Sequence, residues 1–418
     1  MTPILSPSSL ILACWILTGL IVSLTLTNIE NFDLVSVFMA REGLNLSAFT
    51  LIGSIWICLS MLVYLLGDLV GRLSARNQVQ IFAKHDLDLA AVIVFWVNFI
   101  LIFVTCLWIA MSAVKIGGLM KLVTLTYLDA TGARDVLLGT KLFTGMRLFY
   151  AALPATGCLA AAILAMRFSY PLSVKARVLC IFTLSINVVA LFILPMVMSQ
   201  RLLLFQLLIS SYLVTCILRG RVTGLRWLAL ATLLFLTTWI LRESITNAFF
   251  ERSALDIGIQ KLAFYYVNDL WNGFAPLLSD IPHTFGGVSL RGFMFLTLTD
   301  GMFSQVLQPK TDQLDQVLGG GDFPFFTAAY VDFGPIFGAF FIGFCAFVFR
   351  LIFNKAHHSL IWACQYAQLG AALLFSTHGI YFTHQNFLFS IALIWAIHFL
   401  VQRISKREPA LFLSSINA

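Results

Sequence analysis

Charged residues are scarce in this sequence. Asp, Glu, Lys and Arg make up only 11% of its 418 residues and hydrophobic types make up 60%, whereas soluble domains carry about 25% charged residues. A soluble domain is therefore excluded, and the composition predicts an all-α, polytopic bundle of membrane-spanning helices. The net charge of +7 does not indicate nucleic-acid binding, because the basic residues stand in short loops beside apolar runs.

The sequence also lacks the usual cysteine and signal-peptide patterns. Its eight cysteines all fall in apolar segments and none forms a Cys-x-x-Cys pair, so neither a disulfide framework nor a thiolate metal site is expected. Residues 1–7 hold no Lys or Arg, and the apolar run from about Leu10 to Leu26 is long enough to span a bilayer. No internal repeat is visible, which predicts one transmembrane domain over residues 1–418.

What the sequence has instead is a series of apolar runs. Ten are of spanning length: 8–27, 47–67, 89–112, 146–166, 178–198, 202–218, 225–241, 327–349, 359–377 and 386–402. With the N-terminus in the cytoplasm, the inside segments hold 14 Lys and Arg against four acidic residues, and the outside segments hold 12 against 15. The positive-inside rule therefore favours ten spans with both termini cytoplasmic.

The longest polar stretch, residues 242–326, is predicted to be a large outside loop inserted between spans. Part of it shows helical periodicity, with apolar residues on one face and polar residues on another. The apolar positions are Leu255, Ile259, Leu262, Tyr266, Leu270, Phe274 and Leu277, and the polar positions are Asp256, Gln260, Asn268 and Asn272. We expect an amphipathic helix at the interface or on the bundle, ending at Pro282 and Gly286-Gly287.

Arg201 is the most distinctive single cation. It follows a tight outside turn and opens the run 202–218. A helix N-terminus already carries partial positive charge, so a cation is badly placed there unless an anion binds to both. The alternative is an arginine that extends to the lipid headgroups. We expect Arg201 to bind an anion.

The long loop has three arginines, Arg242, Arg252 and Arg291. Two or three converging guanidinium groups would clamp a pyrophosphate through paired hydrogen bonds. The alternative for each is a solvated or structural loop cation.

Several outside residues are candidates for a general base. These are His283, Asp280 and Asp322, with His378 and His384 ranked lower. The histidines lack a third ligand at metal spacing, so no metal is expected. Asp332, in the first turns of a span, needs a partner and is either functional or structural. The motif Asp86-Leu87-Asp88 lies on the predicted inside with no nucleotide-binding domain, so we do not assign it a metal.

Two stretches carry a family resemblance. One is SQRLLLFQLLISSYL (199–213), a short outside turn followed by an apolar span. The other is HTFGGVSL (283–290) with FFTAAYVDFGPIFGAFFIGF (325–344), where the large loop runs into a span. Their order resembles the Wzy-type polymerases of bacterial O-antigen and other oligosaccharide repeat units. The resemblance covers the C-terminal half in detail and the whole chain in topology.

This resemblance implies a GT-C-like, metal-independent glycosyltransferase without a cofactor, at the periplasmic face of the bacterial inner membrane. A hydroxyl of one undecaprenyl-pyrophosphate-linked repeat unit would attack the anomeric carbon of another chain, and lipid pyrophosphate would leave. A chain-length regulator is the protein partner that such an enzyme takes. The residues available for the pyrophosphate are Arg201, Arg291, Arg252 and Arg242, and those for the proton are His283, Asp322 and Asp280.

Two other functions stay open. An O-antigen ligase moves the glycan to a lipid A core, and its families show a histidine near the last loop-to-span junction. Here that place reads GGGDFPFF (319–326), so Asp322 would have to substitute. A lipid-linked oligosaccharide flippase or other transporter tends to have repeated halves and no single large outside loop. The sequence shows no such halves, which favours the polymerase.

Overall fold

The computed structural model describes residues 3–74, 87–143, 145–167, 169–197, 202–279, 282–304, 318 and 321–405. Within these ranges every regular element is a helix. The elements are η1 (Pro3–Leu5), α1 (Pro7–Thr27), η2 (Ile29–Asn31), α2 (Asp33–Arg41), η3 (Leu46–Ala48), α3 (Leu51–Leu73), α4 (Leu87–Ile116), α5 (Leu119–Leu128), α6 (Ala130–Gly139), α7 (Leu148–Ala151), α8 (Leu153–Met166), α9 (Val174–Val197), α10 (Leu202–Leu218), α11 (Leu225–Thr246), η5 (Ala248–Phe250), α12 (Ala254–Phe274), η6 (Ala275–Leu278), α13 (Arg291–Leu296), α15 (Phe325–Ala356), α16 (Leu360–Leu373), η7 (Tyr381–Thr383) and α17 (Gln385–Ser405).

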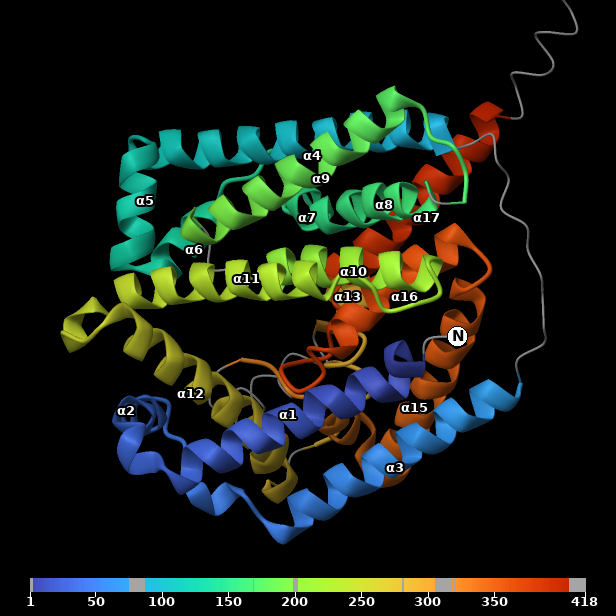
Figure 1. Cartoon of the computed structure of the whole chain (residues 1–418). Coiled ribbons are helices and arrows are strands. Elements are labelled where there is room, and N and C mark those ends of the chain that lie inside the picture. The colour runs from blue at the N-terminus through green and yellow to red at the C-terminus, as the bar shows by residue number, and fades with distance from the viewer. Residues whose placement is uncertain are drawn as a thin grey trace, which may run out of the picture.

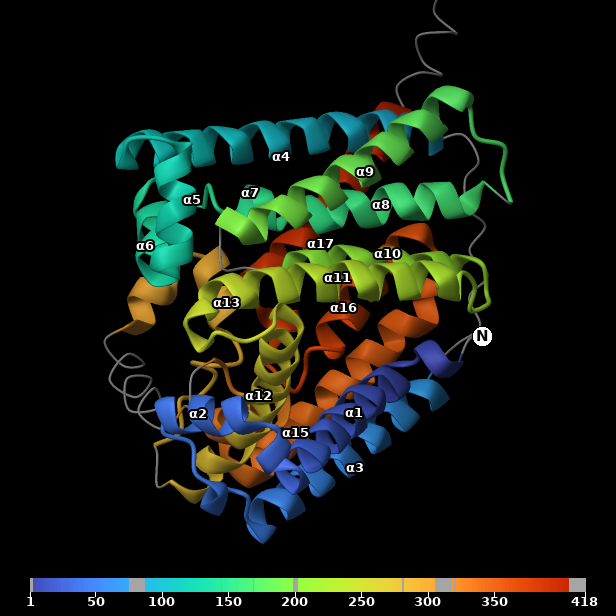
Figure 2. The same cartoon turned by 60° about the vertical axis from the view of Figure 1, so that its left-hand side comes forward.

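The long helices form a bundle in which α4, α8, α9, α10 and α11 run side by side (Figure 1). The short helices α2, α5, α6 and α13 gather at one end of the bundle, together with α12 (Figure 2). We call this the cap end. The N-terminus lies at the opposite end in both views, and α17 ends toward that side as well. The two ends of the bundle therefore differ, because α2, α5, α6, α12 and α13 lie at the cap end.

The predicted all-α membrane architecture is confirmed in its coarse form. Eight of the described helices are long and apolar enough to cross a membrane: α1, α3, α4, the α7–α8 pair, α9, α11, α15 and α17. Large apolar side chains are exposed on their flanks, for example Phe99 and Phe103 on α4 and Phe337 and Phe340 on α15. Such a surface is stable against lipid rather than water, so the chain is a multi-pass membrane protein.

The remaining two predicted spans correspond to shorter helices. The run 202–218 forms α10, with 17 residues, and the run 359–377 contains α16, with 14 residues. Helix α16 contacts α8, α10, α15 and α17, and almost all its residues are buried. Its apolar side chains therefore face other helices and contribute to the centre of the bundle.

Helices α3 and α15 are held together by a close seam of small residues. Gly67 lies against the backbone carbonyl of Gly343, where a Cβ atom would overlap it. Gly67 and Gly71 form a Gly-x-x-x-Gly pattern, which lets helix backbones approach in a membrane. Beside them, Arg350 Nη1 lies 3.4 Å from Asp68 Oδ2 across the seam. Both side chains are mostly buried, so each charge has its partner inside the bundle.

Helix α15 is broken near its start. Gly334 has φ 73° and ψ −176° inside the helix, and Pro335 follows it. A positive φ is readily adopted only by glycine, and proline cannot donate a helical hydrogen bond. The break separates residues 325–333, which include Asp332, from the long part of α15.

The amphipathic helix of the long loop is confirmed as α12, but its predicted end is wrong. It ends at Phe274 rather than at Pro282, because Pro276 lacks the N–H that another helical turn needs. Of its apolar positions, Leu255 and Ile259 are 57% and 48% exposed. The predicted polar residues Gln260, Asn268 and Asn272 are buried instead. The polar face packs onto α2 and the bundle, and Gln260 accepts a hydrogen bond there from Leu34 N.

Candidate functional site

A cavity of about 720 Å³ lies at the cap end of the bundle. Its wall is formed by Trp108 of α4, the end of α6 with the stretch up to Leu148, the stretch around α13, and the two loops that contain Asp322 and His384. The apolar part of the wall includes Trp108, Leu137 and Phe295. The cavity therefore joins segments that are more than two hundred residues apart in sequence.

The stretch around α13 is held in place by Asp332. This fully buried carboxylate accepts hydrogen bonds from Val288 N at 3.0 Å, from Ser289 N at 2.6 Å and from the Thr284 hydroxyl. The backbone carbonyl of Asp332 accepts another from Phe285 N at 2.9 Å. Of the two readings of Asp332, these contacts support the structural one: it fixes the loop that leads into α13.

The far side of α13 is fixed by close packing. Gly292 lies against the carbonyl of Thr383, where a Cβ atom would overlap it. This contact holds α13 beside η7 and the start of α17. Arg291, the first residue of α13, therefore sits on the same cavity wall as Tyr381 and His384.

The opposite wall is built on Trp108 of α4. Its Nε1 donates to the carbonyls of Leu137 at 3.0 Å and Thr140 at 2.8 Å. Its ring stacks on Tyr150, with ring centroids 5.3 Å apart and an interplanar angle of 14°. These contacts anchor the stretch that carries Arg147 into the cavity wall.

The charged side chains in the wall are Lys141, Arg147, Arg291, Asp300 and Asp322. In the described part of the chain, no ion pair is formed by Arg147 or Arg291. Arg147 is nevertheless half-buried, and a partly buried cation is unfavourable without a negative partner. The cavity is therefore suited to an anion with several acceptor oxygens, for which arginine is the usual partner.

His384 contributes a ring to the same wall. Its Nδ1 accepts a hydrogen bond from Asn386 N at 3.3 Å. Burial lowers the pKa of His384 to about 4, with Asp322 opposing this shift and Arg147 adding to it. The imidazole is therefore neutral at ordinary pH. Asp322 itself is exposed and lies against Gly379, where a Cβ atom would be 3.3 Å from the Asp322 Cβ.

A second histidine lies behind the wall. His378 Nδ1 is 2.6 Å from Oδ1 of Asp269, a buried carboxylate on α12. The His378 ring stacks on Tyr381, with centroids 5.8 Å apart and an angle of 10°. Burial raises the pKa of the Asp269 carboxyl, while His378 acts in the opposite direction. Tyr381 thus separates this pair from the cavity.

The predicted site residues are only partly brought together. Arg291 and Asp322 line the cavity. His283 does not: its Nδ1 is 3.2 Å from the carbonyl of Val331, and its ring faces Gly334. Arg201 and Asp280 lie outside the described residues.

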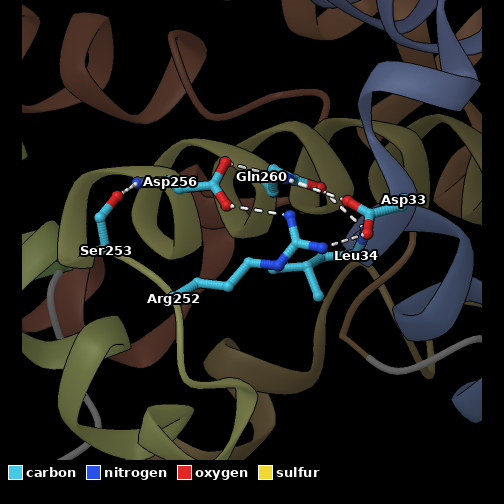
Figure 3. A network of polar contacts seen from close by, with 6 residues as sticks. All are labelled: Asp33, Leu34, Arg252, Ser253, Asp256 and Gln260. Carbon is cyan, nitrogen blue, oxygen red and sulfur yellow. Dashed lines mark hydrogen bonds and ion pairs between the residues drawn. The ribbon is translucent and has the colours of Figure 1, made fainter.

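The other two loop arginines lie elsewhere. Arg242 is buried near the end of α11, and it is not part of the cavity wall. Arg252 pairs with Asp33 at 2.5 Å and with Asp256 at 3.4 Å (Figure 3). The three arginines of the long loop therefore do not converge, and only Arg291 faces the cavity.

The structure also adds residues that sequence reasoning missed. Lys141 lies in the predicted outside segment before the run 146–166, and Arg147 lies at the edge of that run. The sequence contains no signal that either residue would lie on the same cavity wall as Arg291. Asp269 lies buried on α12, at a position that the periodicity of the helix did not single out. His378 and His384 were lower-ranked candidates, and they frame one short loop between the last two apolar runs.

Metal ligation and relatives add nothing to this assignment. Among the described residues, no group of three His, Cys, Asp or Glu side chains is placed to hold a metal ion. Asp86 lies outside the described residues, and Asp88 accepts a hydrogen bond from Ser173 N at 3.1 Å. No protein-family model, curated protein or solved structure matches the chain. The functional argument therefore depends on the cavity and its residues.

Proposed function

We propose that this chain is a membrane glycosyltransferase of the Wzy type. It polymerises undecaprenyl-pyrophosphate-linked oligosaccharide repeat units into O-antigen or a related surface polysaccharide. The proposal includes a GT-C-like bundle of ten spans in the bacterial inner membrane, with both termini cytoplasmic and the cap end in the periplasm. The observation that supports it is the cavity at the cap end, where Arg147 and Arg291 have no ion-pair partner among the described residues.

The cavity suits the charged part of such a substrate. A lipid-linked pyrophosphate carries several anionic oxygens next to a sugar on one side and a hydrocarbon chain on the other. The wall combines the cations Lys141, Arg147 and Arg291 with apolar side chains such as Phe143 and Phe295. Its volume of about 720 Å³ lies within the usual range of roughly 300–1,000 Å³ for small-molecule sites.

The reaction needs one base and one anion-binding group. The attacking hydroxyl oxygen bonds to the anomeric carbon, the bond from that carbon to the pyrophosphate oxygen breaks, and the hydroxyl proton goes to a base. Asp322 is the cavity carboxylate that we assign as the base, because it is exposed on the wall that Arg291 shares. Arg147 and Arg291 stabilise the charge that develops on the departing pyrophosphate.

The direct test is polymerisation by the purified full-length protein in lipid nanodiscs. A synthetic undecaprenyl-pyrophosphate repeat unit should be converted into a ladder of longer lipid-linked chains, and the ladder should persist in EDTA. Transfer to an added lipid A core, without a ladder, would identify a ligase. Movement of the lipid across a proteoliposome membrane without bond formation would identify a transporter and reject the proposal.

A further inference from the structure

His384 occupies an unusual position, because its ring forms the cap of a helix as well as a part of the cavity wall. Its backbone is extended, with φ −66° and ψ 141°, and its carbonyl accepts from Phe387 N at 3.0 Å and Leu388 N at 3.1 Å. Its Nδ1 accepts from Asn386 N at 3.3 Å. This is the geometry of an N-cap residue, whose side-chain acceptor satisfies an unpaired N–H of the first turn.

The capping contact determines which ring nitrogen carries the proton. A nitrogen that accepts a hydrogen bond has no proton, so the single proton of the neutral ring sits on Nε2. Protonating Nδ1 would place its N–H against the Asn386 N–H. It would also place a cation at the N-terminus of α17, which already carries partial positive charge. The cap therefore selects a neutral imidazole with an Nε2–H donor.

The surroundings of the ring point in the same direction. The charged groups that share its cavity wall are Lys141, Arg147, Arg291, Asp300 and Asp322, and Tyr381 is the neighbouring ring. Burial is the main cause of the lowered pKa of His384, at about 4, and Arg147 contributes while Asp322 opposes. No described residue forms a hydrogen bond with Nε2, which leaves that donor for a molecule in the cavity.

We propose that His384 is a neutral hydrogen-bond donor that contacts an anionic phosphoryl oxygen of the lipid pyrophosphate through Nε2. This inference rests on the function proposed above and adds a binding residue to that site. A neutral donor strengthens binding without placing another charge between Arg147 and Asp322. It also cannot compete with Asp322 for the hydroxyl proton, so the two residues keep separate roles.

His378 provides the contrast that makes the assignment specific. Its Nδ1 faces the Asp269 carboxylate at 2.6 Å, so that nitrogen carries a proton, whereas Nδ1 of His384 does not. The two histidines stand at the two ends of one short loop, yet their partners select opposite tautomers. Only His384 lines the cavity.

The first test reads the ring directly and does not depend on activity. The full-length protein is labelled with ¹⁵N-histidine in nanodiscs, and the seven histidines are assigned by single substitutions. His384 should show a neutral ring with the proton on Nε2 from pH 8 down to about pH 5. Titration of His384 near its ordinary pKa of about 6.5, or a proton on Nδ1, would overturn the proposal.

The second test measures binding of a short-chain polyprenyl pyrophosphate by calorimetry. His384→Asn keeps an acceptor for the cap but lacks the reach of Nε2, and we expect it to bind roughly tenfold to a hundredfold more weakly. His384→Gln restores an N–H at longer reach and should recover most of the affinity. His358→Gln, at the other end of the bundle, is the matched control and should bind like the unmodified protein.

The outcomes separate the two proposals. If the unmodified protein neither binds the probe nor extends lipid-linked units, the proposed function fails. If it binds and extends, but His384→Asn binds equally well, only the role of His384 fails. Equal losses in His384→Asn and His384→Gln would show that the ring is needed for packing, and this would also reject the donor role.

Discussion

Two polar clusters at the cap end use the same residue types in opposite ways. In the network between α2 and α12, Arg252 has two carboxylate partners, Asp33 and Asp256 (Figure 3). In the cavity, Arg147 and Arg291 line a volume of about 720 Å³ and form no ion pair with any described residue. Pairing distinguishes the cations that join helices from those that are available to a ligand.

The network between α2 and α12 has an evident structural purpose. Gln260 accepts from Leu34 N at 2.9 Å and donates to Asp256 at 2.9 Å. Beneath it, Phe38 packs on Phe264, with ring centroids 5.4 Å apart. The polar contacts thus orient α2 on α12 over a small apolar core. The described residues give Arg147 and Arg291 no such ion-pair partners, which supports the proposal that an external anion binds in the cavity.

The comparison predicts its largest effect at the cavity arginines. Arg147→Ala and Arg291→Ala should each lower the rate of chain extension by about 10²–10³-fold, because each removes a preorganised cation from the departing pyrophosphate. Lysine at either position should recover only part of the rate, since a point charge cannot form the paired contacts of a guanidinium group. The measurement is single-turnover extension in nanodiscs.

Arg252→Ala is the matched control for this experiment. It removes an arginine from the same end of the bundle and should change the extension rate only a few-fold. A loss as large as that of Arg147→Ala would break the distinction between paired and unpaired cations.

Arg201 lies outside the described residues, and its predicted role as an anion-binding cation depends on the sequence alone. If it binds the pyrophosphate, Arg201→Ala should abolish visible polymer while protein remains in the membrane, and Arg201→Lys should also be poor. The assay is glycan laddering in a deletion strain, normalised to the amount of membrane protein. A normal ladder from Arg201→Ala would show that this arginine only extends to the headgroups.

The next effect is a pH dependence of stability. The pKa of His384 is lowered to about 4 in the fold from an ordinary value of about 6.5, so the unfolded chain binds a proton first as pH falls. The contribution of neutral His384 to the free energy of unfolding is fully present above about pH 6.5. It is lost as pH falls from about 6.5 to about 4, by roughly 2 kcal/mol between pH 7 and pH 5. His384→Gln should remove this part of the loss.

The measurement is the unfolding midpoint in nanodiscs at pH 7 and pH 5 for both proteins. His357, near the opposite end, also has a pKa that burial lowers to about 4, and it contributes loss of the same sign. The unmodified protein and His384→Gln both retain His357, so their difference isolates His384. Identical acid-side losses in the two proteins would contradict the assigned burial and capping of the ring.

Replacing Asp332 should lower stability by an amount similar to or smaller than the loss from protonating His384, and it should also weaken substrate binding. Asp332→Ala leaves the N–H groups of Val288 and Ser289 without their acceptor, which costs about 1–3 kcal/mol for each such buried loss. The loop into α13 would then loosen, and Arg291 would be held less well. We expect a lower unfolding midpoint together with weaker polyprenyl pyrophosphate binding. Asp332→Asn, which keeps one acceptor oxygen, should be intermediate; unchanged binding in both variants would reject the role of Asp332 in positioning Arg291.

The smallest effect is expected in the network between α2 and α12. Its Arg252–Asp33 pair is 42% and 49% exposed, and exposed ion pairs contribute about 0–1 kcal/mol. Asp33→Asn should therefore lower stability by less than about 1 kcal/mol, and 0.5 M salt should reduce the difference further. A large, salt-independent loss would mean that this network is more than a helix-joining contact.

Much of the fold could be predicted because helix formation in a membrane depends on local composition. All ten apolar runs contain helices, and α12 was predicted from its periodicity. The structure adds its N-cap, Ser253, whose side chain accepts from Asp256 N at 3.2 Å. The face of α12 could not be predicted in the same way. Leu255 and Ile259 are exposed because the polar face meets α2 and the bundle, and those partners are distant in sequence.

The sequence by itself determined the class of protein, the helices and the presence of a polar cap end, since each of these follows from residues within one helix or one loop. Only the tertiary structure decided which charges are paired. Asp33 reaches Arg252 across 219 residues, Asp332 reaches back to the loop before α13, and Arg147 shares a wall with Arg291. Such contacts depend on helix packing, whose small residues and bends allow many pairings that no local pattern can distinguish.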